Sequence, residues 1–336
     1  MSAERGAGWP GLLPADRFAR VELGHWPTPL QPCRRLQQQM GGPLIWLKRD
    51  DCSGLAFGGN KTRKLEFLLG EAESRGASGV VTFGAIQSNH ARQTAAACAH
   101  VGVPCHLVLT DSVDRPTEMY RSSGNRLLDG LLGAVVHVVA DNEQAIVKAA
   151  ELAEEDPDLY FIDPGGSSPT GALGYVAAAF ELADQLEAAH LQPELLVLAA
   201  STGGTAAGLV VGLEAAGLTI PVSAVAVYAS GEQTAATITR LVGETATLVG
   251  TDVVEPSRWN VDASALGEGY GIESPESHAA VLGLARAEGV LLDPVYTAKA
   301  FGALIARSRE IDPTSDVVFL HTGGQTGIFA YADSFI

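Results

Sequence analysis

Apolar runs typical of buried strands alternate with helical segments along almost the whole chain. The strand-like runs lie at 43–50, 79–83, 105–110, 134–139, 159–162, 195–200, 223–228, 290–295 and 317–321. The segments between most of these runs have helical periodicity. An alternation of this kind is typical of parallel sheets with helices on their faces. The sequence therefore predicts an α/β fold built from parallel sheets flanked by helices.

The segment DPGGSSPTGALGY, residues 163–175, interrupts this alternation near the middle of the chain. Its glycines, serines and prolines are typical of a crossing between domains. We therefore expect a small α/β domain, residues 57–167, inserted into a large one made by residues 1–56 and 168–336. Such an arrangement leaves a cleft between the domains. Residues 250–275 are rich in glycine and are expected to be irregular.

Composition narrows the class of protein. The chain has 336 residues, of which 46% are hydrophobic, and this is enough for a sizeable core. Its 22 basic and 39 acidic residues give a formal net charge of -17, which repels nucleic acids and anionic membranes. The first residues lack the features of a signal peptide, and no stretch approaches the roughly 18 apolar residues of a membrane span. We expect a cytoplasmic protein with neither a nucleic-acid nor a membrane partner.

The cysteines do not indicate a metal site. The chain contains Cys33, Cys52, Cys98 and Cys105. They show neither CxxC nor any other spacing typical of metal ligands. We expect neither disulfides nor a bound metal.

The segment FGGNKTRKLEF, residues 57–67, places a lysine at the start of a helix. Two glycines form the bend, Asn60 is the expected N-cap, and the helix is expected to begin at Lys61. Because the helix dipole opposes a cation at this end, the amine is expected to serve a function, with an ordinary solvated lysine as the alternative. An asparagine separates the last glycine from the lysine, so the segment does not match the nucleotide-binding pattern GxxxxGK[ST].

Two predicted strand ends lead into helices through polar loops. Ligands of open parallel sheets bind at the carboxyl ends of the strands. The loop GAIQSNH, residues 84–90, presents Ser88 and Asn89 at such a turn. The loop ASTGGTAAG, residues 200–208, offers free backbone N–H groups and three hydroxyls at a helix start, which suits a single phosphate.

Two further loops carry hydroxyls. Tyr296 lies in DPVYTAKAFGAL, and Thr322 lies in HTGGQTG. Taken singly, each loop has a simpler explanation, namely a half-buried core tyrosine or glycines that close a turn. Ser88 lacks a GxSxG context, so it is not expected to be a hydrolase nucleophile, and His90 is expected to be an ordinary helix residue. Together, the lysine, the phosphate loop and the hydroxyls indicate a site for an aldehyde cofactor that bonds a lysine.

Several blocks of the sequence resemble a known family. GGNKTRKLEF, GAIQSNHARQTAA, GGSSPTGALGY, DPVYTAKAFGAL and HTGGQTGIFAY closely resemble the pyridoxal-phosphate enzymes of the D-cysteine desulfhydrase and 1-aminocyclopropane-1-carboxylate deaminase family. The resemblance runs from about Pro27 to Tyr331 and departs from the usual pattern at residues 325–327. It implies a two-domain enzyme of fold type II, similar to the β-subunit of tryptophan synthase. It also implies pyridoxal 5'-phosphate as cofactor, a small amino acid as substrate and a homodimer.

The resemblance also implies roles for individual residues. Lys61 would bond the cofactor covalently, Lys64 would contact its phosphate, and Asn89 would bind its ring hydroxyl. The other residues that it implies for the phosphate are Ser201, Thr202, Gly203, Gly204 and Thr205. The residues that it implies for catalysis are Lys61, Ser88, Tyr270 and Tyr296. Thr297 and Thr322 are expected beside the pyridine ring.

The last two positions favour one branch of the family. The deaminase pattern has a glutamate and a leucine where this chain has Thr297 and Thr322. Threonine hydroxyls need not hold the pyridine nitrogen protonated, and a thiol leaves more readily than an alcohol. We therefore expect α,β-elimination from D-cysteine, giving pyruvate, ammonia and hydrogen sulfide. The alternatives are a 1-aminocyclopropane-1-carboxylate deaminase, a D-serine dehydratase, an L-cysteate sulfo-lyase and, in a different class, a non-catalytic protein that binds a phosphate ligand.

Overall fold

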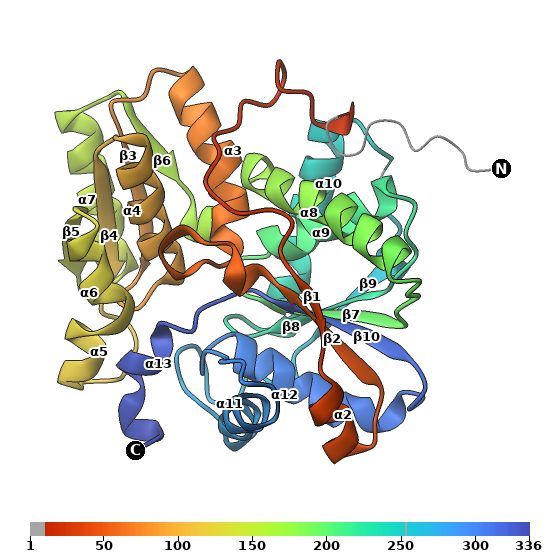
Figure 1. Ribbon diagram of the computed structural model, residues 1–336. Helices are drawn as coiled ribbons and strands as arrows, with labels where there is room; N and C mark the ends of the chain where they lie inside the picture. The colour runs from red at the N-terminus through yellow and green to blue at the C-terminus, as the bar shows by residue number, and fades with distance from the viewer. Residues whose placement is uncertain (1–10, 253) are drawn as a thin grey trace.

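The chain forms two sheets (Figure 1). The computed structural model describes residues 11–252 and 254–336, so the expectation for the first ten residues lies outside it. A six-stranded sheet has the order β1-β2-β10-β7-β8-β9, and a four-stranded sheet has the order β5-β4-β3-β6. All neighbouring strands are parallel except β1 and β2. The predicted α/β fold with parallel sheets is confirmed.

The two sheets draw on different parts of the chain. The strands of the large sheet are β1 (Leu30–Pro32), β2 (Leu44–Arg49), β7 (Leu195–Ala200), β8 (Val222–Ala226), β9 (Trp259–Asp262) and β10 (Asp316–His321). The strands of the small sheet are β3 (Gly79–Ala85), β4 (Cys105–Thr110), β5 (Val135–Val139) and β6 (Leu159–Ile162). The large sheet thus uses both ends of the chain and the small sheet its middle. The domain boundaries at 57 and 167 stay a prediction.

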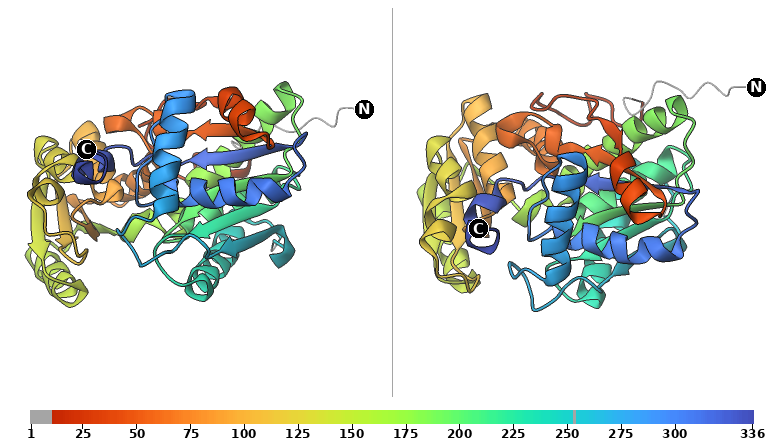
Figure 2. Two further views of the ribbon diagram at one scale, coloured as in Figure 1. Left: turned by 90° about the horizontal axis from the view of Figure 1, so that it is seen from below. Right: turned by 60° about the horizontal axis from the view of Figure 1, so that its bottom comes forward.

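Helices cover both faces of the large sheet (Figure 2). One face carries α8 (Pro169–Ala188), α9 (Gly204–Ala215) and α10 (Gly231–Val249), and the other carries α2 (Arg34–Met40), α11 (Pro275–Glu288) and α12 (Thr297–Arg307). The helices beside the small sheet are α4 (Asn89–Val101), α5 (Glu118–Ser122), α6 (Gly124–Leu131) and α7 (Asn142–Glu155). The short α13 (Gly327–Ala330) packs against α5 and α6, so the end of the chain returns to the small sheet.

Three strand expectations differ from the structure. The apolar run 290–295 forms no strand. It lies in a loop, in which Leu292 is buried and Leu291 is 52% exposed. The short edge strands β1 and β9 were not expected. β9 pairs with β8 inside the glycine-rich region that was predicted to be irregular. Whether a short segment forms a strand depends on whether a neighbouring strand pairs with it. The sequence of the segment alone does not show this.

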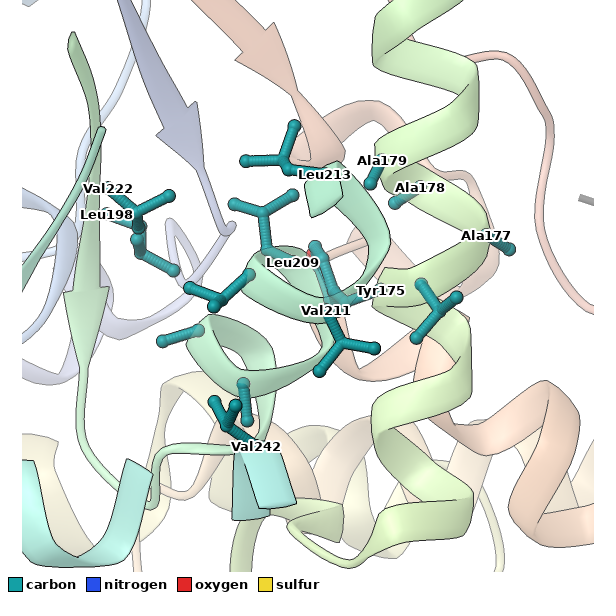
Figure 3. Close-up of a cluster of buried hydrophobic side chains, with 14 of the residues drawn as sticks. Tyr175, Ala177, Ala178, Ala179, Leu198, Leu209, Val211, Leu213, Val222 and Val242 are labelled. Carbon is teal, nitrogen blue, oxygen red and sulfur yellow. The ribbon is translucent and has the colours of Figure 1, made fainter. Parts of the chain in front are cut away.

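Helix α3 (Asn60–Ser74) lies between the two sheets and packs on α8 beside the large sheet and on α4 beside the small one. Figure 3 shows that core, in which Tyr175, Leu209 and Val211 of α8 and α9 lie among buried side chains of the sheet. A Cβ added at Gly174 of α8 would lie 2.2 Å from the carbonyl oxygen of Arg63 in α3. Only glycine permits this approach, so α3 and α8 pack backbone against backbone.

A buried ionic cluster also holds α3 in place. The Arg63 guanidinium donates to Asp50 Oδ2 at 2.8 Å and to Glu181 Oε1 at 2.8 Å. Tyr175 also donates to Asp50, at 2.5 Å, and Lys48 pairs with Glu181. Burial acts to raise the pKa of Asp50, but the charge and hydrogen bonds of Arg63, together with Lys48 and Tyr175, outweigh it and lower this pKa to about 2. α3 is therefore tied to the end of β2 and to α8.

We expect Arg63→Leu to lower the free energy of unfolding by about 3 kcal/mol or more, because it leaves two buried carboxylates without their main partner. Urea unfolding of the variant measures the loss. Arg75→Leu is the matched control, since Arg75 pairs with Glu71 at the exposed end of the same helix. This control should change stability by less than about 0.5 kcal/mol. Equal losses in the two variants would contradict the role given to the buried cluster.

Candidate active site

A cavity of about 640 Å³ lies where the carboxyl ends of strands from both sheets meet. Its wall includes residues at or after the ends of β3, β4, β7, β8 and β10. The predicted site residues that line it are Lys61, Lys64, Ser88, Asn89, Ser201, Thr202, Gly203, Thr205, Tyr270, Tyr296 and Thr322. Gly204 and Thr297 were also predicted for the site but do not line this cavity.

Lys61 reaches the cavity from the first turn of α3. Its amine donates to Asn60 Oδ1 at 2.9 Å, and Asn60 Nδ2 donates to Thr205 Oγ1 at 2.9 Å. Burial, followed by the positive charge of Arg92, lowers the pKa of Lys61 to about 8. A lysine with this pKa is neutral in about a tenth of the molecules at pH 7, far more often than an ordinary lysine, and can then act as a nucleophile or a base.

The start of α3 differs from the expectation. The helix begins at Asn60 with Gly59 at the capping position, and no side chain of the cap residue bonds the first turn. The Asn60 side chain instead joins Lys61 to Thr205. Gln93 of α4 supplies the missing acceptor, because its Oε1 takes the backbone N–H of Thr62 at 3.0 Å. A partner that is distant in sequence thus replaces the local cap.

Lys64 lies one turn further along α3, and its amine reaches the start of α9. Its amine donates to Gly165 O at 3.0 Å and to Ser167 Oγ at 3.1 Å, and burial lowers its pKa well below the usual value. A Cβ added at Gly204 would lie 3.0 Å from this amine. The Gly204 N–H itself donates to Ser167 Oγ at 3.2 Å, so this glycine provides close approach rather than a free donor. Lysine, hydroxyls and a helix N-terminus together could hold a phosphate group.

The loop after β3 orients two polar side chains. Ser88 caps α4, and its Oγ accepts the N–H of Ala91 at 3.1 Å. Asn89 Oδ1 accepts from Asn125 Nδ2 at 2.8 Å, which fixes the direction of the Asn89 amide. His90 also lines the cavity, where its Nδ1 has no partner among the described residues. Burial lowers the pKa of His90 well below the usual range, so the ring is neutral.

Three tyrosines form one side of the cavity. The hydroxyls of Tyr270 and Tyr296 bond each other, and the ring of Tyr228 lies edge-on to that of Tyr270, with centroids 5.0 Å apart. Burial raises the pKa of Tyr270 to about 12 and that of Tyr296 well above its usual value. Both phenols are therefore protonated at neutral pH and can donate a hydrogen bond or a proton.

The two threonines expected beside a ring have different surroundings. Thr322 lines the cavity. Thr297 is fully buried, and its hydroxyl donates to Asp293 Oδ1 at 2.6 Å. The carboxylate of Asp293 also accepts the backbone N–H groups of Tyr296 and Thr297. Thr297 is thus turned toward Asp293 and does not line the cavity, so its expected place beside the ring stays a prediction.

Three contributors escaped the sequence analysis. Ser167 bonds both Lys64 and Thr202. Its segment was interpreted as a domain crossing and as one block of the family resemblance, and this serine was given no role. Tyr228 follows β8, so the rule that ligands bind at strand ends could have found it. Asp293 orients the loop of Tyr296, and no feature of the sequence distinguishes it from an ordinary turn aspartate.

Within residues 11–252 and 254–336, no group of three His, Cys, Asp or Glu side chains could hold a metal ion. The four cysteines are free thiols. No helix in the described part of the chain is both long and apolar enough to cross a membrane.

The chain is similar to known enzymes over most of its length. The family model described as pyridoxal-phosphate dependent enzyme matches residues 21–323. The 1-aminocyclopropane-1-carboxylate deaminase of Burkholderia ambifaria is 38% identical over 333 residues, which cover 95% of this chain and 98% of the relative. The enzyme of the same name from Burkholderia cenocepacia is 39% identical over 329 residues, covering 94% of this chain and 97% of the relative.

Solved structures agree with this similarity. A crystal structure described as an ACC deaminase homologue has a TM-score of 0.87 and 36% identity, and the match covers 98% of both chains. A fungal L-serine ammonia-lyase from Rhizomucor miehei has a TM-score of 0.68 at 18% identity. That match covers 94% of this chain and 98% of the fungal one, and it shows the shared fold alone. The chain therefore belongs to the pyridoxal-phosphate-dependent enzymes of fold type II, in the family of the 1-aminocyclopropane-1-carboxylate deaminases.

Proposed function

We propose that this enzyme deaminates 1-aminocyclopropane-1-carboxylate, using water to give 2-oxobutanoate and ammonia. The observation that carries the proposal is the full-length similarity, at 38% and 39% identity, to relatives with this name. The sequence alone favoured D-cysteine. The comparisons favour the cyclopropane amino acid, which was the alternative.

The residues of the cavity fit pyridoxal phosphate. The cofactor needs a lysine amine for its aldehyde and several donors for its phosphate, and Lys61 and Lys64 supply these on one helix. We assign the phosphate to Lys64 and the loop from Ser201 to Thr205, and the ring hydroxyl to Asn89. Once bound, pyridoxal phosphate supplies a ring that takes up negative charge from the Cα of the substrate.

The protein groups around the substrate move protons. The amine of Lys61, when neutral, can take a proton from carbon and return it. The cyclopropane substrate has no hydrogen on Cα, so protons must be moved at its ring carbons instead. The protonated hydroxyls of Tyr270 and Tyr296, together with that of Ser88, are among the donors on this cavity wall, and we assign the task to them. They can also bind the substrate carboxylate.

D-cysteine is the second candidate substrate, and the observation that favours it is the hydroxyl of Thr322 on the cavity wall. The deaminase pattern has a leucine at this position. A hydroxyl here leaves a polar wall, and the thiol of cysteine needs less help to leave than a ring carbon does. The products would be pyruvate, ammonia and hydrogen sulfide.

A substrate screen tests the proposal. We expect 1-aminocyclopropane-1-carboxylate to release 2-oxobutanoate and ammonia with a kcat/KM at least about tenfold above that of any other substrate tested. The other arms are D-cysteine, L-cysteine, D-serine and L-cysteate, each assayed for its own oxo acid. Sulfide and pyruvate from D-cysteine, with no 2-oxobutanoate from the cyclopropane substrate, would replace the first proposal by the second.

Thr322→Leu supplies a control for this screen. If the hydroxyl at this position favours thiol elimination, the variant loses D-cysteine turnover relative to turnover of the cyclopropane substrate. We prefer it to a change at Thr297, because a glutamate there would meet the carboxylate of Asp293. An unchanged ratio of the two activities would remove the argument for D-cysteine.

We expect Lys61→Ala to abolish both turnover and the visible absorbance of the lysine-bound cofactor. Lys64→Ala should keep that absorbance but weaken retention of the cofactor during dialysis, because one charged contact to the phosphate is lost. Lys148→Ala, a change at an exposed ion pair of α7, is the matched control and should behave like the wild type. Wild-type turnover in Lys61→Ala would show that another amine bonds the cofactor.

The pKa of Lys61 predicts how covalent loading of cofactor-free protein depends on pH. Only the neutral amine attacks an aldehyde, so the loading rate should rise with pH through about 8 and then level off. For a free lysine side chain, the rise would continue to about 10.4. Stopped-flow absorbance after mixing with pyridoxal phosphate measures the rate at each pH.

Asp129 provides the control for this profile, since burial raises its pKa to about 7 and it titrates in the same range. Asp129→Asn should leave a midpoint near pH 8. A loading rate in the wild type that still rises at pH 10 would contradict the lowered pKa of Lys61. The homodimer and the cytoplasmic location expected from the sequence stay predictions.

A further inference from the structure

The turn before the catalytic lysine has an unusual backbone. Ala56, Phe57, Gly58 and Gly59 all have positive φ values, of 41°, 70°, 64° and 129°. This region is unfavourable for residues with a Cβ, and two of the four are not glycine. The Phe57 side chain is 59% exposed, so its own packing does not hold the turn. Other contacts must stabilise it.

Arg92 of α4 makes such contacts. Its side chain is fully buried, and its guanidinium donates to the carbonyl oxygen of Ala56 and, at 3.3 Å from both terminal nitrogens, to that of Gly58. Left-handed backbone at successive residues brings these two carbonyls to the same side. One planar, charged donor can therefore bind both of them.

The ionic surroundings of Arg92 are also unusual. In the part of the chain that the structure describes, no carboxylate lies within salt-bridge distance of it. A buried cation is costly unless its donors are satisfied. The carbonyls of the turn accept from the two terminal nitrogens of Arg92, and its Nε has no partner among the described residues. The guanidinium and the turn thus stabilise each other.

Neighbouring side chains hold the same turn at other atoms. Ser53 Oγ accepts the N–H of Gly59 at 2.9 Å, and Gln93 Oε1 accepts that of Thr62. Gln325 Nε2 donates to the carbonyl oxygen of Phe57 at 2.9 Å. Gln325 lies in the short stretch where the sequence departs from the pattern of its family. Arg92 differs from these partners because it binds two carbonyls and carries a charge.

We propose that Arg92 is a positioning residue for Lys61: by binding the carbonyl oxygens of Ala56 and Gly58, it holds the left-handed turn that presents the lysine amine to the cavity. The role concerns attachment of the cofactor and does not depend on which amino acid the enzyme deaminates. The positive charge of Arg92 acts in the same direction, since it adds to the effect of burial in lowering the pKa of Lys61.

The alternative is that the Arg92 side chain only fills space where α4 packs on its neighbours. A set of variants separates the two roles. Arg92→Lys keeps the charge but loses the fork that spans two carbonyls, and Arg92→Gln loses both. Ala56→Gly makes the left-handed turn easier to form without any change to α4.

The readout is the rate of covalent loading of cofactor-free protein as a function of pH, with circular dichroism as a check on folding. We expect Arg92→Lys to load about tenfold more slowly or worse, because small displacements of a reacting group have large effects on rate. Its pH midpoint should stay near that of the wild type. Arg92→Gln should load slowly and with a midpoint at higher pH. Ala56→Gly alone should stay within about twofold of the wild type.

The double variant Arg92→Lys with Ala56→Gly decides between the two roles. If Arg92 acts through the turn, glycine at position 56 restores loading by at least about threefold. A packing defect in α4 would not be corrected by that change. Arg126→Gln is the matched control, an arginine near Asp129 that makes no hydrogen bond to the turn among the described residues.

Three results would overturn the proposal. The first is wild-type loading in both Arg92 variants, and the second is no recovery in the double variant. The third is failure of both Arg92 variants to fold even with Ala56→Gly, because α4 rather than the turn would then depend on the arginine. Slow loading, recovery with glycine and an unaffected Arg126→Gln together would support it.

Discussion

The buried contact of Arg63 with Asp50 and Glu181 determines where α3 lies, and the active site depends on that helix. Asp50 follows β2 and Glu181 lies on α8, so the contact ties α3 to a strand of the large sheet and to a helix that packs on that sheet. The close approach of Gly174 leaves α3 no freedom to shift along α8. Lys61 and Lys64 are therefore positioned by the large sheet, although α3 also contributes leucines to the core of the small one.

Charge is distributed unevenly between the surface and the cavity. The chain carries a formal charge of -17, which opposes the approach of anions. The cavity nevertheless contains the amines of Lys61 and Lys64, and Arg92 lies buried behind them. These local donors could hold a phosphate in spite of the negative charge of the whole protein. A zwitterionic amino acid has no net charge and is therefore not repelled.

Much of the fold and part of the site could be predicted from the sequence. The alternation of apolar runs indicated the parallel sheets, and the rule about strand ends located several of the polar residues that line the cavity. The errors arose where a distant partner decides the outcome. Asn60 has the right side chain for a cap, but Thr205 and Lys61 bind it instead. Thr297 has the right position for the cavity, but Asp293 takes its hydroxyl. Neither competing partner can be identified without the three-dimensional arrangement.

The spacing of the two lysines on α3 has a consequence for how the enzyme would hold its cofactor. The two lysines are three positions apart, which is a rise of about 4.5 Å along the helix. This distance depends on the helix alone and not on how the two sheets are placed relative to each other. By the assignment proposed above, the aldehyde end and the phosphate end of the cofactor would be held from one helix and from α9 beside it. Ile146 and Ala149 of α7, by contrast, line the cavity from the side of the small sheet. The cavity wall therefore joins two independent supports, and the two lysines share only the one that α3 provides.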